Sequence, residues 1–144
     1  MLPGMYYMPS KHHATQRIEP LDNDCLRPPR YSLVTLAHDK LEVTRRCLSG
    51  ILCFSLFDEA TEMIVVDNGS SDGTAQWIAE ELPRIGAERG VAVKTILNGG
   101  NAGCSTARNQ ALEIASGRYI VFVDNDVEPR TAHWLPLLRS RIES

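Results

Sequence analysis

The sequence predicts an α/β fold in which a Rossmann-like, mostly parallel sheet is flanked by helices. Two observations support this prediction. Short runs of consecutive apolar residues, typical of strands buried on both faces, alternate along the chain with segments whose apolar residues recur at helical spacing. The connections between these segments are short, and right-handed crossovers then make successive strands parallel. No internal repeat or low-complexity tract interrupts the alternation.

The regular pattern begins after residue 30. Residues 32–36 form a short β-prone run, and a helix is expected from Asp39 to about residue 56. Asp39 and Glu42, three residues apart at the start of this helix, resemble a capping box. Asp39 is therefore assigned first to a helix cap and only second to a ligand. Residues 63–66, which are all apolar, form the second expected strand.

The second half of the chain continues the alternation. The sequence predicts a helix from Asp72 that ends at Pro83 and Gly86, strands at residues 91–97 and 119–123, a helix at 105–116 that Gly117 stops in a C′ position, and a helix at 134–142. The expected order is therefore β-α-β-α-β-α-β-α.

The composition fits one globular domain, placed at residues 31–144 and preceded by a flexible leader at residues 1–30. The leader holds five of the eight prolines and shows no periodic apolar pattern. Fifteen basic and eighteen acidic residues give a net charge of −3, which argues against a nucleic-acid binder with a basic stripe. A polyanionic ligand would then be held locally, by a metal or by backbone amides.

The sequence also bears on location and on the cysteines. No run approaches the ~20 apolar residues that a membrane span needs, and residues 1–13 lack the apolar core of a signal peptide. A cytoplasmic location is expected, with peripheral association at the inner membrane face left open. The four cysteines form no Cys-x-x-Cys pair and are expected to be reduced thiols without a metal or disulfide role.

The acidic segment Asp124-Asn125-Asp126 follows directly on the strand expected at residues 119–123. Because residues i and i+2 of an extended segment point the same way, Asp124 and Asp126 are expected to face one ligand, with Asn125 turned aside. Two carboxylates suit Mg²⁺ or Mn²⁺, which prefer hard oxygen ligands and can add substrate phosphates to them. The alternative is a turn whose residues happen to be acidic.

A second acidic residue, Asp67, follows the strand at residues 63–66. The carboxyl ends of parallel strands meet at one edge of a sheet, so we expect Asp67 and Asp126 to share a polar crevice there. Asp67 is assigned mainly to a ligand, as an acceptor for a base N–H or a sugar hydroxyl. Asp72 lies in a segment rich in turn and capping residues and is assigned mainly to a helix cap.

The glycine-rich loop at residues 98–103 can bring backbone amides close to a ligand. No G-x-G-x-x-G fingerprint follows the first strand, which disfavours a dinucleotide oxidoreductase, and the loop lacks the Lys-Ser/Thr ending of a P-loop. Arg108, in the first turns of the next helix, is a candidate partner for a phosphate or for Asp67. A solvated helix charge is the alternative for Arg108.

Taken together, these motifs resemble the N-terminal half of a family 2 glycosyltransferase of the GT-A fold. The resemblance runs from residue 32 to the end of the chain and rests on residues 34–39 and 44–48, 64–74, 98–103, 107–112 and 117–126. It implies a nucleotide-diphosphate sugar donor of the UDP or dTDP type, a saccharide or lipid-linked acceptor, and transfer with inversion at the anomeric carbon.

The resemblance also implies roles for individual residues. Those implied to bind the nucleotide sugar are Ala37, Asp39, Asp67, Asn101, Arg108, Asp124 and Asn125. The Asp124-Asn125-Asp126 segment takes the place of the D-x-D motif, in which Asp126 would coordinate the metal and Asp124 is a second candidate ligand. The metal would act as a Lewis acid on the departing diphosphate.

The sequence departs from the family's pattern at three positions. Ala37 stands where many relatives carry Thr and Asp39 where many carry Asn, and both changes bear on base recognition. Cys104 takes a place often filled by a bulkier apolar residue. The family's catalytic base comes from the segment beyond the D-x-D motif, and no residue here, His133 included, is a candidate for it.

We therefore expect a domain that is incomplete at its C-terminus. The alternatives to a transferase are a donor-binding or interaction module without turnover, and a scaffold whose acidic strand ends are plain turns. An incomplete sheet would leave an edge strand and an apolar face uncovered, which predicts self-association of the chain.

Overall fold

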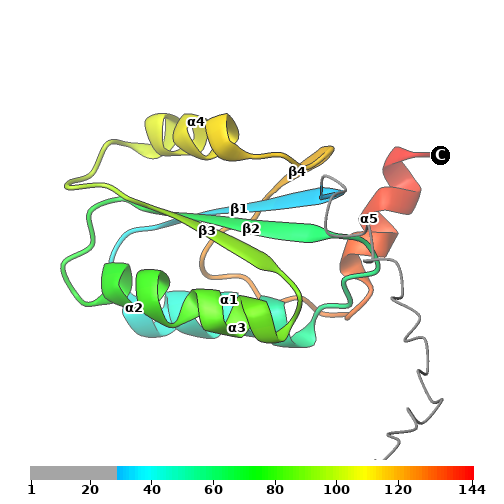
Figure 1. The fold of residues 1–144 in the computed structure, drawn as a ribbon, viewed down its shortest axis with the longest axis horizontal. Coiled ribbons are helices and arrows are strands. Elements are labelled where there is room, and N and C mark those ends of the chain that lie inside the picture. Colours follow the sequence, from blue (N-terminus) through cyan, green and yellow to red (C-terminus); the bar gives the residue numbers. More distant parts are fainter. Residues whose placement is uncertain (1–28) are drawn as a thin grey trace, which may run out of the picture.

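A computed structural model describes residues 29–144 and shows a four-stranded parallel sheet with helices on both faces (Figure 1). The strands are β1 (Tyr31–Ala37), β2 (Thr61–Asp67), β3 (Ala92–Leu97) and β4 (Tyr119–Phe122), in the spatial order β3-β2-β1-β4. The predicted α/β fold with flanking helices is confirmed. The leader predicted at residues 1–30 lies outside the described residues except for its last two.

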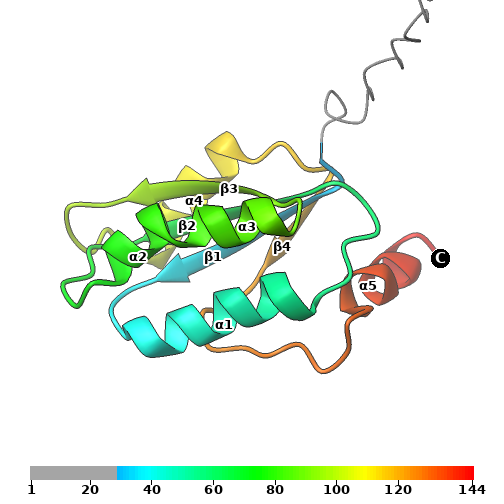
Figure 2. The same cartoon turned by 60° about the horizontal axis from the view of Figure 1, so that its bottom comes forward.

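The helices form a layer on each face of the sheet. One face is covered by α1 (Leu41–Phe54), α2 (Thr74–Glu80) and α3 (Leu82–Glu88), and the other by α4 (Cys104–Ile114) (Figures 1 and 2). A further helix, α5 (Trp134–Ile142), lies at the end of the sheet where β1 begins. The strands end at the opposite edge, where the loops that lead into α1, α2 and α4 lie.

Strand β2 forms the centre of the core, because all seven of its residues are buried. Met63 and Val65 join the cluster beneath α1, α2 and α3, whereas Ile64 and Val66 join a smaller cluster to which α4 contributes two alanines. Each fully buried aliphatic side chain stabilises the fold by roughly 1.5–3 kcal/mol. Burial on both faces thus explains the consecutive apolar residues of this strand.

The helix that was expected to end at Pro83 continues instead as α3. Pro83 lies in the first turn of α3, where its missing N–H leaves no hydrogen bond unmade. Gly86 also does not end the helix. A Cβ added there would lie 2.4 Å from Cγ2 of Val93, so this glycine allows α3 to approach β3 closely.

Gly117 does not take the left-handed C′ conformation that the sequence predicted. Helix α4 ends at Ile114, and the chain leaves it through an extended Ala115 with φ −70° and ψ 133°. Gly117 instead passes close to β1, because a Cβ at this residue would lie 2.5 Å from the backbone nitrogen of Ser32. The glycine is therefore needed for the packing of the chain against β1.

Two further observations concern the described residues only. No helix in residues 29–144 is both long and apolar enough to cross a membrane. Cys47, Cys53 and Cys104 are free thiols in this part of the chain.

Candidate functional site

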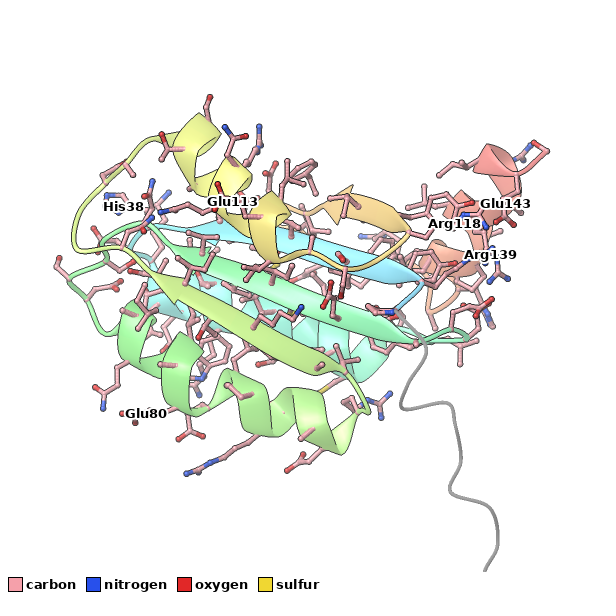
Figure 3. The ribbon with its side chains drawn as sticks, turned by 45° about the horizontal axis from the view of Figure 1, so that its top comes forward. His38, Glu80, Glu113, Arg118, Arg139 and Glu143 are labelled. Carbon is pink, nitrogen blue, oxygen red and sulfur yellow. The ribbon has the colours of Figure 1, made fainter. Side chains whose placement is uncertain are left out.

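The loops at the carboxyl ends of the strands enclose a hollow of about 420 Å³, which we call the rim hollow. Figure 3 marks this end of the sheet by the label of His38. The residues that line the rim hollow are Leu36, Ala37, His38, Lys40, Asn68, Asn101, Gly103, Cys104, Arg108, Asp124, Asn125 and Asp126. Eight residues were implied to bind the donor or the metal. Six of them line the rim hollow, whereas Asp39 and Asp67 do not.

The Asp124-Asn125-Asp126 turn is anchored to α1. The amide nitrogen Nδ2 of Asn125 donates a 2.8 Å hydrogen bond to Oγ1 of Thr44, which is fully buried. The thiol of Cys47 donates to the backbone carbonyl of Asp124 at 3.4 Å, and burial raises the pKa of this thiol. These contacts hold the turn while Asp124 and Asp126 are exposed at the rim hollow.

The two carboxylates of this turn fit a divalent cation of the Mg²⁺ or Mn²⁺ type. Neither Asp124 nor Asp126 forms an ion pair with another residue of the described chain. Residues 29–144 contain no group of three or more His, Cys, Asp or Glu side chains that could hold a metal by themselves. Mg²⁺ in phosphate-transfer sites is commonly held by one or two carboxylates together with substrate phosphates, so two exposed carboxylates match that chemistry.

Asp67 lies at the same edge of the sheet as Asp126, on the other side of β1. Its side chain accepts hydrogen bonds from its own loop. It is 1% exposed. Its Oδ2 accepts hydrogen bonds from the backbone N–H groups of Gly69 at 3.1 Å and Ser70 at 2.9 Å, and its Oδ1 accepts from the Ser70 hydroxyl. The carboxylate therefore shapes the turn after β2, and its predicted contact with a ligand stays a prediction.

The next residue, Asn68, lines the rim hollow and was not singled out from the sequence. Its Oδ1 accepts from the N–H of Ala102 at 2.9 Å and from Nδ2 of Asn98 at 3.2 Å, and its Nδ2 donates to Oδ1 of Asn101 at 2.9 Å. Asn101 in turn accepts from the N–H of Gly103 at 2.9 Å. This group of side chains, the amide network, fixes the loop at residues 98–103 against the end of β2.

Gly69 allows these loops to touch. Gly69 has a positive φ of 83°, and a Cβ at this residue would lie 2.5 Å from the Cα of Gly100. Because any side chain at residue 69 would collide with backbone, the turn after β2 and the loop after β3 require glycine at this contact.

The capping box predicted from Asp39 and Glu42 is wrong. Lys40 is the N-cap of α1, in a left-handed conformation, and no side chain caps the helix at that position. Asp39 also has a positive φ, of 54°, and its Oδ1 accepts from the N–H of Ser71 at 2.7 Å. Asp39 thus ties the loop after β1 to the loop after β2 and does not line the rim hollow.

Asp72 caps two helices. It caps α1, which the sequence pattern had assigned to Asp39, and also α2, which was assigned to Asp72 itself. Its Oδ2 accepts from the N–H of Leu41, the first residue of α1, at 2.9 Å, and its Oδ1 accepts from the N–H of Thr74, the first residue of α2, at 3.0 Å. The hydrogen bond from the Thr74 hydroxyl and the one from Leu41 lower the pKa of this carboxyl. One carboxylate therefore fixes the starts of both helices at the edge of the site.

The rim hollow is also lined by groups that carry positive charge. The first turn of α4, with Gly103 and Cys104, lines it and presents the positive end of the helix dipole. The guanidinium of Arg108 lies 5.4 Å from the centre of the Phe122 ring and does not pair with Asp67 as the sequence had suggested. Lys40 adds a further cation. The rim hollow thus brings together two carboxylates, two cationic side chains and the start of a helix.

A family model described as glycosyl transferase family 2 matches residues 32–144. Among curated relatives, the uncharacterized glycosyltransferase YibD of Escherichia coli is 33% identical over 58% of this chain and 23% of its own length. The putative teichuronic acid biosynthesis glycosyltransferase TuaG of Bacillus subtilis is 43% identical over 45% of this chain and 24% of its own length.

Solved structures with a similar arrangement of strands and helices include a mannosyltransferase and the protein TarS. The mannosyltransferase PcManGT of Pyrobaculum calidifontis superposes with a TM-score of 0.63 at 23% identity, over 76% of this chain and 31% of its own. TarS of S. aureus superposes with a TM-score of 0.65 at 22% identity, over 79% of this chain and 31% of its own. These similarities establish a GT-A fold. The chain spans a third or less of the lengths of the curated relatives described above.

Proposed function

Since the chain belongs to glycosyl transferase family 2, we propose that its rim hollow binds a nucleotide-diphosphate sugar with a divalent cation. The proposal includes transfer of the sugar, with inversion at the anomeric carbon, to a saccharide or lipid-linked acceptor. One observation carries it: Asp124 and Asp126 share a hollow with Arg108 and the N-terminus of α4. A cation and a diphosphate can therefore be bound side by side.

The similar solved structures support the ligand class. The mannosyltransferase PcManGT was solved in complex with GDP-Man and Mn²⁺, and TarS was solved with UDP-GlcNAc and with UDP. Both proteins were therefore solved in complex with nucleotides that carry a diphosphate, and a divalent cation would neutralise the negative charge of that diphosphate. A donor of the UDP, dTDP or GDP type is the class that we carry over to this chain.

The carboxylates of Asp124 and Asp126 would hold the cation against the diphosphate. A bound Mg²⁺ or Mn²⁺ supplies Lewis-acid stabilisation of the charge that develops on the departing diphosphate. Asn125 holds the turn through its hydrogen bond to Thr44, and Asp124 and Asp126 both line the rim hollow. A prepositioned pair of ligands lowers the entropic cost of binding the cation.

The other side of the rim hollow would receive the rest of the donor. The free N–H groups at the start of α4 and the guanidinium of Arg108 suit phosphate oxygens, because both donate hydrogen bonds and carry positive charge. Ala37 and Asn68, at the ends of neighbouring strands, and Asn101 line the rim hollow and would contact the base and ribose. Asp39 and Asp67 would then act by holding the loops that surround the nucleotide.

Binding without turnover is the second candidate function. The attacking hydroxyl needs a general base within hydrogen-bond reach, and we assign this role to no residue among residues 29–144. Donor hydrolysis, or transfer to added saccharide acceptors, would identify an enzyme. Donor binding without either reaction would identify a binding module.

Calorimetric titration of the full chain with UDP-, dTDP- and GDP-sugars, with and without Mn²⁺, tests the donor proposal. We expect binding that depends on Mn²⁺ and is lost in Asp126→Asn, which keeps the shape of the side chain but removes its charge. Glu113→Gln is the matched control, because Glu113 is an exposed residue of α4 outside the rim hollow (Figure 3). Equal binding by the Asp126→Asn variant, or no binding by folded protein, would refute the site.

A further inference from the structure

Two adjacent residues in the loop that joins β1 to α1, Asp39 and Lys40, have left-handed backbones, with φ of 54° and 59°. They are the only residues other than glycine with positive φ between residues 29 and 144. Aspartate adopts this conformation more readily than most residues, because its short side chain can hydrogen-bond locally, and Asp39 accepts from the N–H of Ser71. Lysine has no such advantage. The conformation of Lys40 therefore costs stability.

Contacts of the backbone, and not of the lysine side chain, hold Lys40 in this conformation. Its carbonyl accepts from the N–H groups of Val43 and Thr44, both at 3.0 Å. The N–H of the next residue, Leu41, donates to the carboxylate of Asp72. Glycine or asparagine would adopt the same φ at a lower cost. What lysine adds at this residue is therefore its side chain.

The position is also unfavourable for a positive charge. Lys40 is the N-cap of α1, where serine, threonine, aspartate and asparagine are preferred, and the start of a helix carries partial positive charge of its own. The acidic neighbours of Lys40 face other cations: Asp39 lies 4.0 Å from His38, and Glu42 lies 3.5 Å from Arg45. Lys40 itself forms no ion pair within residues 29–144.

The side chain of Lys40 is exposed and lines the rim hollow. It shares the rim hollow with Arg108 and with the carboxylates of Asp124 and Asp126, and no two of these four residues form an ion pair. Opposite charges that line one hollow without pairing leave space for a ligand that carries both signs, such as a cation bound to a diphosphate. The ammonium of lysine is a compact point charge, which suits phosphate oxygens better than the directional groups of a base.

We propose that Lys40 binds the diphosphate of the donor beside the cation, and that this contact is what lysine contributes at a residue where it costs stability. The inference rests on the proposed donor site and adds to it a phosphate contact from the loop after β1. Arg108 and the start of α4 would hold the diphosphate from a second element. Because neither cationic side chain depends on a metal, the rim hollow should also bind inorganic pyrophosphate in the absence of Mn²⁺.

Calorimetric titration of the full chain tests this role with two kinds of probe. The nucleoside diphosphates UDP, dTDP and GDP are titrated with Mn²⁺, and inorganic pyrophosphate is titrated without it. We expect Lys40→Met, which keeps an unbranched side chain but removes the charge, to weaken the binding of both probes by about tenfold or more. Lys40→Arg retains a cation and should bind nearly as well as the unchanged protein. Arg84→Met, an exposed change on α3 outside the rim hollow, is the control for net charge and should leave both affinities unchanged.

Lys40→Asn separates this role from a structural one. Asparagine tolerates a positive φ and is favoured at an N-cap, so we expect the midpoint of urea unfolding to rise while both affinities fall by about tenfold or more. Lys40→Met should raise the midpoint less, because methionine retains the cost of the backbone conformation. A residue with only a structural role would lower the midpoint when it is replaced. Circular dichroism of each variant shows whether it is folded.

The possible outcomes distinguish this inference from the donor proposal itself. Unchanged affinity of folded Lys40→Met for both probes, with Mn²⁺-dependent nucleotide binding lost in Asp126→Asn, would overturn the role of Lys40 and leave the donor site standing. Binding of pyrophosphate alone, weakened in Lys40→Met, would support the phosphate contact and refute the nucleotide donor. No binding of either probe by the unchanged protein would overturn both proposals. A lower unfolding midpoint in Lys40→Asn would show that the lysine supports the fold and would overturn the inference.

Discussion

The carboxylate of Glu62 on β2 and the ammonium of Lys94 on β3 form an ion pair at 2.7 Å beneath the end of α4. Glu62 is 2% exposed and also accepts from the N–H of Ser116 at 2.6 Å and from the hydroxyl of Ser32 at 2.5 Å. The ammonium of Lys94 donates to the carbonyl of Ile114 at 2.9 Å. Because α4 buries only two alanines in the core, this polar group is a main attachment of its C-terminal end.

Glu62→Gln should destabilise the fold. The substituted amide keeps the shape of the buried side chain but leaves the partly exposed Lys94 without its charged partner. We expect the free energy of unfolding at pH 7 to fall by about 1–3 kcal/mol, which urea denaturation would measure. Glu113→Gln, an exposed change on α4, should stay within about 0.5 kcal/mol of the unchanged protein. Equal stability of both variants would show that the ion pair contributes nothing.

The same residue makes stability depend on pH. Burial raises the pKa of Glu62, but the hydrogen bonds from Lys94, Ser116 and Ser32 outweigh it, so the pKa is lowered from its ordinary value of 4.5. A lowered pKa contributes stability that is complete above the unfolded value and is lost as pH falls through the folded value. The difference in unfolding free energy between the unchanged protein and Glu62→Gln should therefore narrow below pH 4.5. A constant difference down to about pH 3 would contradict this assignment.

Gly69→Ala should disrupt the contact between the two loops of the rim hollow. A methyl group at this residue meets the backbone of Gly100 and must also accept a positive φ of 83°. We expect a loss of about 2–4 kcal/mol in thermal or urea unfolding. Gly99→Ala is the matched control, because a Cβ there has no atom within 4 Å. A similar loss of unfolding free energy in both variants would show that neither loop tolerates an added side chain, whether or not that side chain meets other atoms.

Local patterns in the sequence predicted the elements whose causes are local. The helix expected at residues 134–142 is found as α5 (Trp134–Ile142), and the apolar run at residues 63–66 is the buried centre of β2. Pro83 and Gly117 were misread because a proline also suits a first helical turn and a glycine also suits a close approach. Sequence alone does not distinguish these uses of the two residue types.

The site was less predictable because long-range contacts decide which side chains reach it. Asp72 caps α1 across 31 positions of sequence, which no capping motif of three residues can reveal. Asp67 and Asn68 are neighbours, yet backbone N–H groups hold the first side chain in its own turn and the second faces the rim hollow. The sequence shows that polar residues follow β2, but not which of them faces the rim hollow.

Asn68→Ala should loosen the loop at residues 98–103. The change leaves the N–H of Ala102 and the side chains of Asn98 and Asn101 without their partner in the amide network. We expect amide hydrogen exchange in this loop to rise by about tenfold, equivalent to about 1.4 kcal/mol, while exchange in β2 stays slow. Asn109→Ala, an exposed change on α4, is the control. Unchanged exchange in the loop would mean that backbone contacts alone hold it.

Thr44→Val tests how the Asp124-Asn125-Asp126 turn is held. Valine keeps the shape of the buried threonine but removes the oxygen that accepts the 2.8 Å hydrogen bond from Asn125. If the donor proposal holds, calorimetry with Mn²⁺ should show nucleotide-sugar affinity reduced by about tenfold, because groups that orient metal ligands commonly affect metal binding to this extent. Thr44→Ser retains the hydroxyl and should bind nearly as well as the unchanged protein. Equal binding by the valine and serine variants, with both folded by circular dichroism, would show that the carboxylates of Asp124 and Asp126 are positioned without help from α1.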